Sequence, residues 1–424
     1  MSREKLEGEK ALASGGQSFS PSAPVGDGQL SSVSVIGLLN NWEIFGQERG
    51  NIEVLKCLKS LGANVAVGVT TMNQGGDVAL LLRQLGFETF DVPFGCQWSK
   101  KFFWQAPRLI PKNLAAVSRC SAVLDKQIKA RQCSLLLLGN PLVYSFVSLS
   151  LIRNRKLPLI YRMGDEPPTD SKPNLWIWRR CFRRAKMIVA NSWYVQSKIA
   201  EAEAESPRKV RLIYNVAPTV SSPGQPSEDG EILSEPDRDL LRVLYVGQIS
   251  EHKGVVHLLD AALALCSGNP KLHFHFVGGS LYTWPLEEQL QKDVIAAGLT
   301  GQIVFHGRVS DPSEFYRTAN VLVVPSLFEE PAANVVLEAK RCGVPAIVYP
   351  SGGLPELVQH GVTGFVCNEK SVSALMGHLQ TLLEQPETFR QMKDACVLDY
   401  QMRFSENRFR VQWLDAVKQA LGEG

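Results

Sequence analysis

Short apolar runs that alternate with amphipathic stretches constrain the fold of this chain more than any other feature. In the first half, such runs have the length of buried strands at residues 33–37, 64–69, 135–139, 158–162 and 187–191. The stretches between them, such as IEVLKCLKSLG at residues 52–62, repeat apolar residues every three or four positions and so predict helices. Continuously apolar strands separated by helices predict a parallel sheet that is covered on both faces.

The same alternation recurs later in the chain, with strands expected at residues 242–247, 272–278, 303–307, 320–326 and 345–349. Residues 217–239 are rich in proline, serine, glycine and acids, which is typical of a linker. We therefore predict an α/β protein with two Rossmann-like doubly wound domains, at residues 31–216 and 240–402, that face each other across a cleft. Residues 1–30 are predicted to be a disordered tail. Residues 403–424 are predicted to form a helix that packs back on the first domain.

Charge and cysteine content exclude several classes of protein. A formal charge of +3 over 424 residues gives no indication of nucleic-acid binding. The nine cysteines contain no C-x-x-C pair, which argues against a zinc ribbon and for reduced thiols in the cytosol. The N-terminus lacks the apolar segment of a signal peptide. The apolar run at residues 135–152 is interrupted by Asn140-Pro141, so a buried strand, a turn and a core helix are expected there rather than a membrane span.

Two acids eight positions apart, Glu330 and Glu338, lie around the expected start of a helix in EEPAANVVLEAKRCGVP. Asn334 is predicted to be the N-cap of this helix, whose first-turn N–H groups suit a phosphate. Ala333 is small enough to let a ligand approach the backbone. Both carboxylates are expected to face one cleft, where they would accept hydrogen bonds from the hydroxyls of a sugar nucleotide. The alternative is a solvated Glu330 and a Glu338 that the helix dipole favours.

A glycine turn and a lysine follow the next candidate strand, in VLYVGQISEHKGVVHLL at residues 243–259. Gly247 permits the tight turn, and a helix is expected from about Gly254. Lys253 stands at the helix start, where a positive charge opposes the helix dipole. A residue that breaks a local rule at the carboxyl end of a strand indicates a functional site. We therefore expect Lys253 to hold a diphosphate; the alternative is an ordinary surface lysine.

Two further segments are weaker candidates. Gly278, in FHFVGGS, ends a strand and would let a base or ribose lie on the backbone. The loop at residues 38–51 is predicted to be mobile at Gly46 and Gly50, with Glu48 and Arg49 as polar tips that reach phosphates across the cleft. A purely structural loop is the alternative.

The order of these motifs resembles the retaining glycosyltransferase family 4, a branch of the glycosyl transferases group 1. The matching segments are G-x-I-S-x-x-K-G, V-G-G, F-H-G-R-V, P-S-x-F-E-E-P-x-x-N-V-V-L-E-A, S-G-G-L-P-E-L-V and G-V-T-G-F. The strongest match covers about residues 242–367, and the spacing of Glu330 and Glu338 resembles the family's E-x7-E signature. The first half fits more loosely, through residues 38–51, 187–195 and 212–216.

The resemblance implies a GT-B-type fold, a nucleotide-diphosphate sugar as the donor, retention at the anomeric carbon, and neither cofactor nor metal. Glu330 would then hold hydroxyls of the donor sugar, and Glu338 the ribose. Lys253 would neutralise the negative charge that develops on the departing diphosphate. Arg308 and Val309 would lie beside the base.

Departures from the family's pattern concern the phosphates and the acceptor. Gln248 stands where the family usually has an arginine, so either Lys253 suffices or Arg49 assists from the other domain. The first loop lacks the usual pair of adjacent glycines. Arg162 and Asp165 occupy a segment in which many members have a histidine before the aspartate. We expect these two residues to touch the acceptor, and no general base is assigned.

Two basic segments with interleaved aromatic residues, at residues 98–112 and 175–186, lie in the first domain. On a helix, Leu175, Trp178, Phe182 and Ala185 share one face, with arginines around it. The hypothesis is peripheral contact with the inner face of the cytoplasmic membrane, where lipid-linked saccharides would be acceptors. The alternative is an ordinary core-facing helix with a solvated rim.

We therefore predict a cytoplasmic enzyme that moves a hexose from a nucleotide-diphosphate sugar to a saccharide or lipid-linked acceptor, in the synthesis of cell-surface polysaccharide or glycolipid. Asp237 and Asp239 have the D-x-D spacing that binds a metal in another class of sugar transferase, but they lie in the linker, so no metal site is expected. Two alternatives remain open. One is a sugar-nucleotide epimerase on a similar scaffold, and the other is a non-catalytic sugar-nucleotide-binding protein.

Overall fold

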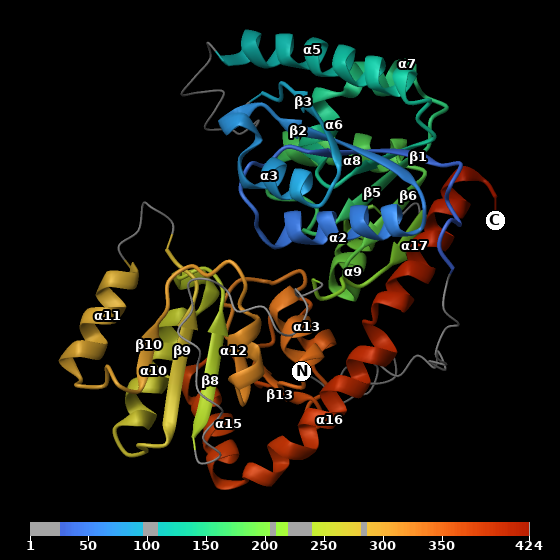
Figure 1. The fold of residues 1–424 in the computed structure, drawn as a ribbon. Coiled ribbons are helices and arrows are strands. Elements are labelled where there is room, and N and C mark those ends of the chain that lie inside the picture. The colour runs from blue at the N-terminus through green and yellow to red at the C-terminus, as the bar shows by residue number, and fades with distance from the viewer. Residues whose placement is uncertain (1–25, 96–108, 204–208, 219–239, 281–285, 424) are drawn as a thin grey trace.

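The computed structural model describes residues 26–95, 109–203, 209–218, 240–280 and 286–423 (Figure 1). The predicted tail up to residue 25, residues 219–239 of the predicted linker with its D-x-D, and residues 98–108 of the first basic segment lie outside the described residues. The described chain forms two lobes, each built around one parallel sheet. The predicted α/β class with two facing Rossmann-like domains is confirmed.

The N-terminal sheet has the strand order β3-β2-β1-β4-β5-β6-β7, and all its pairs are parallel. Ile36 is in register with Ala66 on one side and with Leu136 on the other. The strands are β1 (Ser34–Leu39), β2 (Asn64–Thr70), β3 (Glu88–Val92), β4 (Leu135–Leu138), β5 (Leu159–Met163), β6 (Met187–Ala190) and β7 (Val210–Leu212). The helices are α2 (Gly46–Ser60), η1 (Met72–Gly75), α3 (Gly76–Gln84), α5 (Leu109–Ala130), α6 (Pro141–Phe146), α7 (Ser148–Arg153), α8 (Lys172–Arg184) and α9 (Trp193–Ala202).

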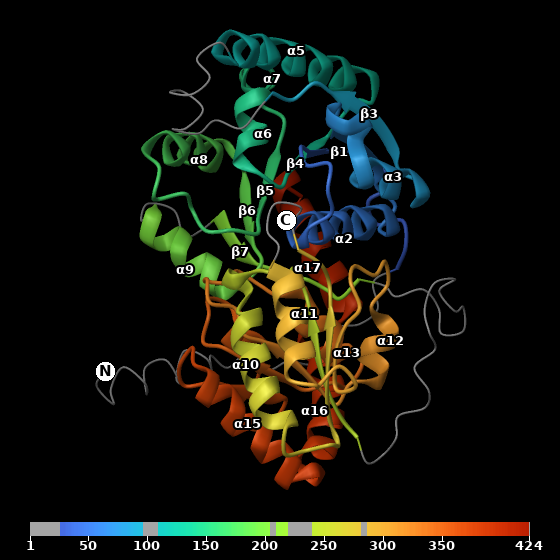
Figure 2. The ribbon, with the colours of Figure 1, turned by 90° about the vertical axis from the view of Figure 1, so that its left-hand side faces the viewer.

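The C-terminal sheet has the order β10-β9-β8-β11-β12-β13, again parallel. Its strands are β8 (Leu241–Val246), β9 (Leu272–Val277), β10 (Ile303–Phe305), β11 (Val321–Val324), β12 (Ala346–Val348) and β13 (Gly364–Val366). The helices that follow them are η3 (Glu251–Lys253), α10 (Val255–Cys266), α11 (Leu286–Ala296), α12 (Ser313–Thr318), α13 (Asn334–Arg341), α14 (Leu354–Leu357), α15 (Val372–Glu384), α16 (Pro386–Arg403) and α17 (Glu406–Leu421). Figure 2 shows α10, α11 and α15 on the near side of this sheet.

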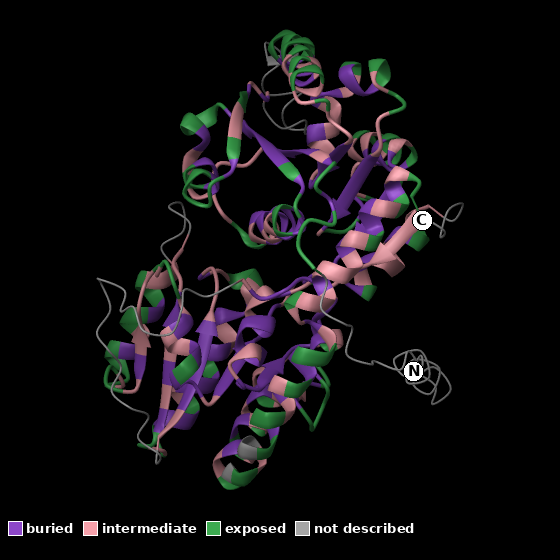
Figure 3. Cartoon of the chain, turned by 45° about the vertical axis from the view of Figure 1, so that its right-hand side comes forward, coloured by how far each residue is buried: buried purple, intermediate pink, exposed green. Residues whose placement is uncertain are grey.

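Both faces of each sheet are buried, which explains the near-continuous apolar strands (Figure 3). In β4, Leu135 and Leu137 pack into the core on the side of α2 and α3, whereas Leu136 and Leu138 pack against α5, α6 and α8. The run at residues 135–152 is thus strand β4, a turn and the helices α6 and α7, as expected. Asn140 caps α6 by accepting a hydrogen bond from Leu142 N at 2.8 Å. In the part of the chain that the structure describes, none of the helices combines the length and apolarity that a bilayer crossing requires.

The last helix, α17, returns to the N-terminal lobe (Figure 1). Its Trp413 is buried in the same apolar cluster as residues of α2. Asp415 forms an ion pair with Arg211 of β7, and Arg410 donates to Asp27 at 2.7 Å. These contacts make α17 a second connection between the two lobes, because α16, which precedes it, packs on α13 of the C-terminal lobe.

Candidate functional site

The strand order reverses between β8 and β11, and ligands of doubly wound sheets bind in the crevice at such a switch point. Lys253 lies in the short η3 turn after β8, and Glu330 lies in the loop after β11. Lys253 Nζ is 3.1 and 2.9 Å from the two carboxylate oxygens of Glu330, and Ser326 Oγ donates to Glu330 Oε2 at 3.0 Å. The structure therefore brings the two predicted catalytic residues together at the predicted edge of the sheet.

The backbone around Glu330 is held by the segment after β12. Gly353 N donates to Glu330 O at 2.7 Å, and Gly352 N donates to the side chain of Glu329 at 2.5 Å. Gly352 has a φ of 55°, and any side chain there would collide with the backbone of Glu330. The two glycines are thus needed for the close approach of two loops, and this approach fixes the position of the Glu330 carboxylate.

Glu338 is a buried acid on α13, with only 7% of its side chain exposed. Tyr316 donates its phenolic hydrogen to Glu338 Oε2 at 2.7 Å, whereas Oε1 has no hydrogen-bond donor. Arg49 Nη1 of the N-terminal lobe lies 4.0 Å from Oε1. Burial raises the pKa of Glu338, against the opposing effects of Tyr316 and Arg49. A buried carboxylate oxygen without a donor is unusual in a folded protein, so Oε1 is a ready acceptor for a ligand hydroxyl.

Asn334 does not cap α13 as predicted. The N-cap is Ala333, which is buried and provides no side-chain cap, and Asn334 is the first helical residue. Its side chain instead bridges the lobes: Nδ2 donates to Gly46 O at 3.2 Å, and Oδ1 accepts from Asn215 Nδ2 at 2.7 Å. The Asn334 side chain thus contacts the other lobe and does not cap its own helix. The N-cap residue, Ala333, offers no side-chain acceptor to the first-turn N–H groups of α13.

The prediction of a mobile loop at residues 38–51 is wrong for its second half, because α2 already begins at Gly46. Glu48 is not a polar tip; it is buried and accepts a hydrogen bond from Asn41. Gly50 is also buried, and a side chain there would collide with the guanidinium of Arg162. Arg49 projects toward the other lobe, as its approach to the Glu338 carboxylate shows.

Arg162 is fully buried at the carboxyl end of β5. It donates to Asn51 Oδ1 at 2.9 Å and to Asn215 Oδ1 at 2.8 Å, and burial lowers its pKa to about 10. Asp165 is exposed. The protein atoms around it still restrict its hydration, which raises its pKa. The charge of Arg162 opposes this rise, and the charge of Glu330 adds to it. Asp165 of the N-terminal lobe therefore lies close enough to Glu330 of the other lobe for their charges to interact. Contact of either residue with an acceptor stays a prediction.

The remaining predicted positions have mostly structural contacts. Gly278 has a φ of 137°, and a side chain there would overlap the carbonyl oxygen of Gly247, so its role in the structure is close packing of two strand ends. Gln248 accepts a hydrogen bond from Tyr245 through its backbone carbonyl at 2.6 Å. Arg308 lies alongside Gly279. Val309 packs at the margin of the apolar core.

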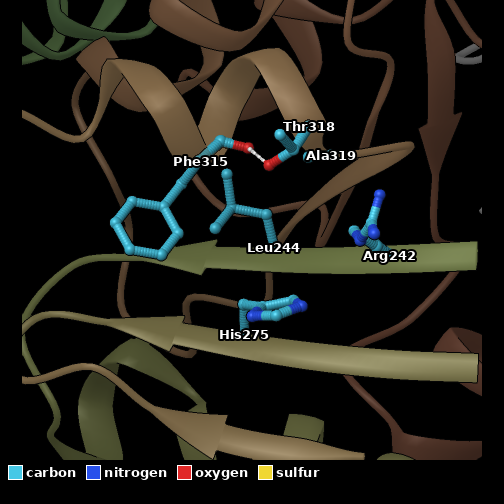
Figure 4. Close-up of a pocket in the computed structure, with 6 residues that line it drawn as sticks. All are labelled: Arg242, Leu244, His275, Phe315, Thr318 and Ala319. Atoms are coloured by element: carbon cyan, nitrogen blue, oxygen red, sulfur yellow. Dashed lines mark hydrogen bonds between the residues drawn. The ribbon is translucent and has the colours of Figure 1, made fainter. Parts of the chain in front are cut away.

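A small cavity lies between α12 and the strands β8 and β9, toward the end of β8 that is opposite Lys253 (Figure 4). Its lining includes Arg242 and His275, whose Nη1 and Nε2 atoms are buried without hydrogen-bond partners. Burial is the largest cause that lowers the pKa of His275 to about 4, followed by the charges of His306 and Arg242. The cavity is too narrow for a water molecule, so it is not a ligand site.

Among the described residues, no three His, Cys, Asp or Glu side chains are grouped so that they could hold a metal ion. A metal-independent reaction stays a prediction. Sequence reasoning missed two residues that join the lobes, Asn215 and Glu356. Both lie inside motifs that were noted, LIYNV and S-G-G-L-P-E-L-V, but nothing in the sequence indicates which residues they contact.

Comparison with known proteins agrees with this architecture. Residues 233–396 match the family described as glycosyl transferases group 1. The chain carries a glycosyltransferase domain. The chain is 27% identical over 268 residues to a D-inositol 3-phosphate glycosyltransferase of Thermobifida fusca, covering 61% of this chain and 59% of that protein. It is 24% identical over 316 residues to an uncharacterised 41.2 kDa protein in the cps region of Klebsiella pneumoniae, covering 70% of this chain and 81% of that protein.

The fold of the chain is also that of a solved structure. Anabaena HepE in complex with UDP superposes with a TM-score of 0.73 at 19% identity, covering 91% of this chain and 100% of that one. The predicted GT-B arrangement of two α/β domains is therefore confirmed. The prediction of a glycosyltransferase is confirmed by the family match of residues 233–396 and by the relatives named as glycosyltransferases.

Proposed function

We propose that the chain is a retaining glycosyltransferase of family 4 that transfers a hexose from a nucleotide-diphosphate sugar to a saccharide or lipid-linked acceptor, without a metal ion. The observation that carries this proposal is the grouping of one ammonium and two acids at the switch point. Lys253 contacts Glu330, and Glu338, on the helix α13 that follows the Glu330 loop, has a buried oxygen without a donor.

The donor's parts match the groups that are present. Glu338 Oε1 would accept a hydrogen bond from a ribose hydroxyl, which would supply the donor that this buried oxygen lacks. Lys253 and the first-turn N–H groups of α13 would hold the diphosphate. Glu330 would exchange its contact with Lys253 for hydroxyls of the sugar. A related fold solved with UDP-glucose supports a donor of this class.

In the proposed reaction, the bond between the anomeric carbon and the diphosphate oxygen breaks, the acceptor oxygen bonds to the same face of the sugar, and the proton of the acceptor hydroxyl passes to the departing diphosphate. Negative charge then develops on the diphosphate. Lys253, once released from Glu330 by the bound donor, and the backbone N–H groups would stabilise that charge, and little further reorganisation would be needed as the bond breaks. Closure of the two lobes would exclude water and limit hydrolysis of the donor.

The acceptor is proposed to lie on the side of the N-terminal lobe, near Asp165. Membrane contact of this lobe also remains a proposal. The apolar face of α8, on which the hypothesis of membrane contact was based, cannot make this contact. Trp178 and Phe182 on that face are buried in the core, as the core-facing alternative expected. Trp176 is 60% exposed, with the guanidinium of Arg180 4.7 Å from its ring centre, and would have to make the contact. Equal co-sedimentation with neutral and anionic vesicles would argue against it.

The proposal is tested by ligand binding followed by turnover. Thermal shifts are measured with UDP, GDP and ADP sugars, where a ligand at 100 times its dissociation constant stabilises by about 2.7 kcal/mol. Transfer is then measured for the wild type, Glu330→Ala, Lys253→Ala and the exposed control Glu288→Gln. We expect transfer to be lost in the first two variants only. A product formed without any acceptor would indicate an epimerase, binding without turnover would indicate a binding protein, and no stabilisation by any nucleotide sugar would refute the proposal.

A further inference from the structure

One carboxylate of the C-terminal lobe caps a helix of the N-terminal lobe. Glu356, in the short helix α14, accepts hydrogen bonds from Trp193 N at 2.6 Å and Tyr194 N at 2.5 Å, the first two N–H groups of α9. Tyr214 donates its hydroxyl hydrogen to the same carboxylate at 3.0 Å. A negative charge at a helix N-terminus is stabilised by the helix dipole and by the free N–H groups, so this is a strong contact for a single side chain.

The cap of α9 is shared between the two lobes. Ser192 Oγ accepts from Val195 N at 3.1 Å, and Glu356 supplies the acceptors for the two preceding N–H groups. Without Glu356, those two groups would have to be hydrated, and water would have to enter between the lobes. The contact therefore favours the closed arrangement over an open one.

The same segment that carries Glu356 also holds Glu330. Gly353, three residues before Glu356, donates its N–H to Glu330 O at 2.7 Å. A side chain on Gly353 would lie 3.2 Å from Ser192 Cβ, so the segment packs directly on the N-terminus of α9. Arg403 on α16 donates to Glu356 O at 2.7 Å and fixes the far end of the segment. A short piece of backbone thus touches both the Glu330 loop and the other lobe.

We propose that Glu356 is a positioning residue that couples closure of the two lobes to the placement of Glu330. This inference rests on the proposed function, in which Glu330 orients the donor sugar. Lys253 and Glu338 would still bind the nucleotide part when the lobes separate, because both belong to the C-terminal lobe. Loss of the cap is therefore expected to impair transfer more than binding, and to admit water that hydrolyses the donor.

The test compares Glu356→Gln with the wild type and with the exposed control Glu288→Gln. Glutamine keeps the shape of the side chain, but it removes the charge and replaces one acceptor by an NH₂ group that cannot accept from an N–H. We expect the dissociation constant of UDP, measured by calorimetry, to change less than about threefold. We expect kcat for transfer to fall roughly 10- to 100-fold, as for a misplaced reacting group, and the ratio of donor hydrolysis to transfer to rise. Glu356→Asp, which keeps the charge, should recover part of the loss.

A measurement that needs no turnover separates this inference from the proposed function. Small-angle scattering of the full chain should give a larger radius of gyration for Glu356→Gln than for the wild type or the control. Unchanged scattering and unchanged kcat in Glu356→Gln would overturn the inference, as would a loss of UDP affinity that matches the loss of kcat. If the wild type binds no nucleotide sugar, the proposed function fails, and scattering alone then decides whether Glu356 holds the lobes closed.

Discussion

Replacement of Glu338 by glutamine should have opposite effects on folding and on ligand binding. Burial raises the pKa of Glu338, so the folded protein binds a proton at this group more readily than the unfolded chain does. The ionised form therefore opposes folding at neutral pH, and this cost is relieved as the pH falls. Glutamine keeps an oxygen for the Tyr316 hydroxyl and removes the charge. The ligand-free variant should be as stable as the wild type or more stable.

The affinity for the donor should move in the other direction. A hydrogen bond from a ribose hydroxyl to a charged acceptor contributes about 1.5–3 kcal/mol, because its alternative is a buried oxygen with no donor. At about 1.4 kcal/mol per tenfold change, the dissociation constant should rise roughly 10- to 150-fold. Loss of the ion pair with Arg49 should change the affinity little, because the Arg49 side chain is 40% exposed and its Nη1 lies 4.0 Å from Glu338 Oε1.

The assay is titration calorimetry with the nucleotide sugar that stabilises the wild type, together with urea unfolding of the ligand-free protein. Glu288→Gln, an exposed acid on α11, is the control for the substitution itself. An unchanged dissociation constant would refute the role of Glu338 in binding. Destabilisation of the ligand-free variant by more than about 2 kcal/mol would show that the carboxylate is instead a structural partner of Tyr316.

Three further predictions follow from other parts of the structure. Lys253→Ala should lower kcat about 10²- to 10³-fold, as for other preorganised groups that stabilise developing charge; a kcat within tenfold of the wild type would contradict this. Gly278→Ala should destabilise the fold by about 2 kcal/mol or more in urea unfolding, because its positive φ and the carbonyl of Gly247 exclude a side chain; an unchanged midpoint would contradict it. The pKa of His275 is 6.5 in the unfolded chain but about 4 in the folded protein, so the unfolded chain binds the proton more readily. The free energy of unfolding should therefore fall by at most roughly 3 kcal/mol as the pH is lowered from 6.5 to 4. His275→Gln should flatten that pH dependence, and an identical profile would show that His306 or another group is responsible.

The strands that were predicted from the sequence are apolar at most of their residues. β4 and β11 are buried at every residue, so their composition alone identifies them. β3 was missed because it has only one fully buried residue, Val92. β7 was missed because none of its three residues is fully buried, and in β13 the only fully buried residue is a glycine, Gly364. A short or half-exposed strand is defined by its partner in the sheet rather than by its own apolar pattern.

Helix starts were less predictable than helix existence. α2 has a phenylalanine N-cap, Gly46 in its first turn and Gly50 directly after it, which are poor local signals for a helix; Gly50 packs closely against Arg162. Asn334 has the chemistry of an N-cap, but hydrogen bonds to Gly46 and Asn215 hold its side chain toward the other lobe. In both cases a tertiary contact overrides the local preference.

The sequence by itself determined the fold class, the two domains and the residue types of the candidate site. It could do so because burial on both faces of a parallel sheet requires nearly continuous apolar strands and helices with apolar residues every three or four positions. Only the tertiary structure decided which of these residues meet. Lys253 and Glu330 are 77 positions apart and come together because β8 and β11 are neighbours in the sheet. Glu356 and Trp193 are 163 positions apart, and their hydrogen bond exists only when the lobes are packed against each other. Contacts of this kind depend on strand order and on the packing of the lobes, which no local pattern of residues encodes.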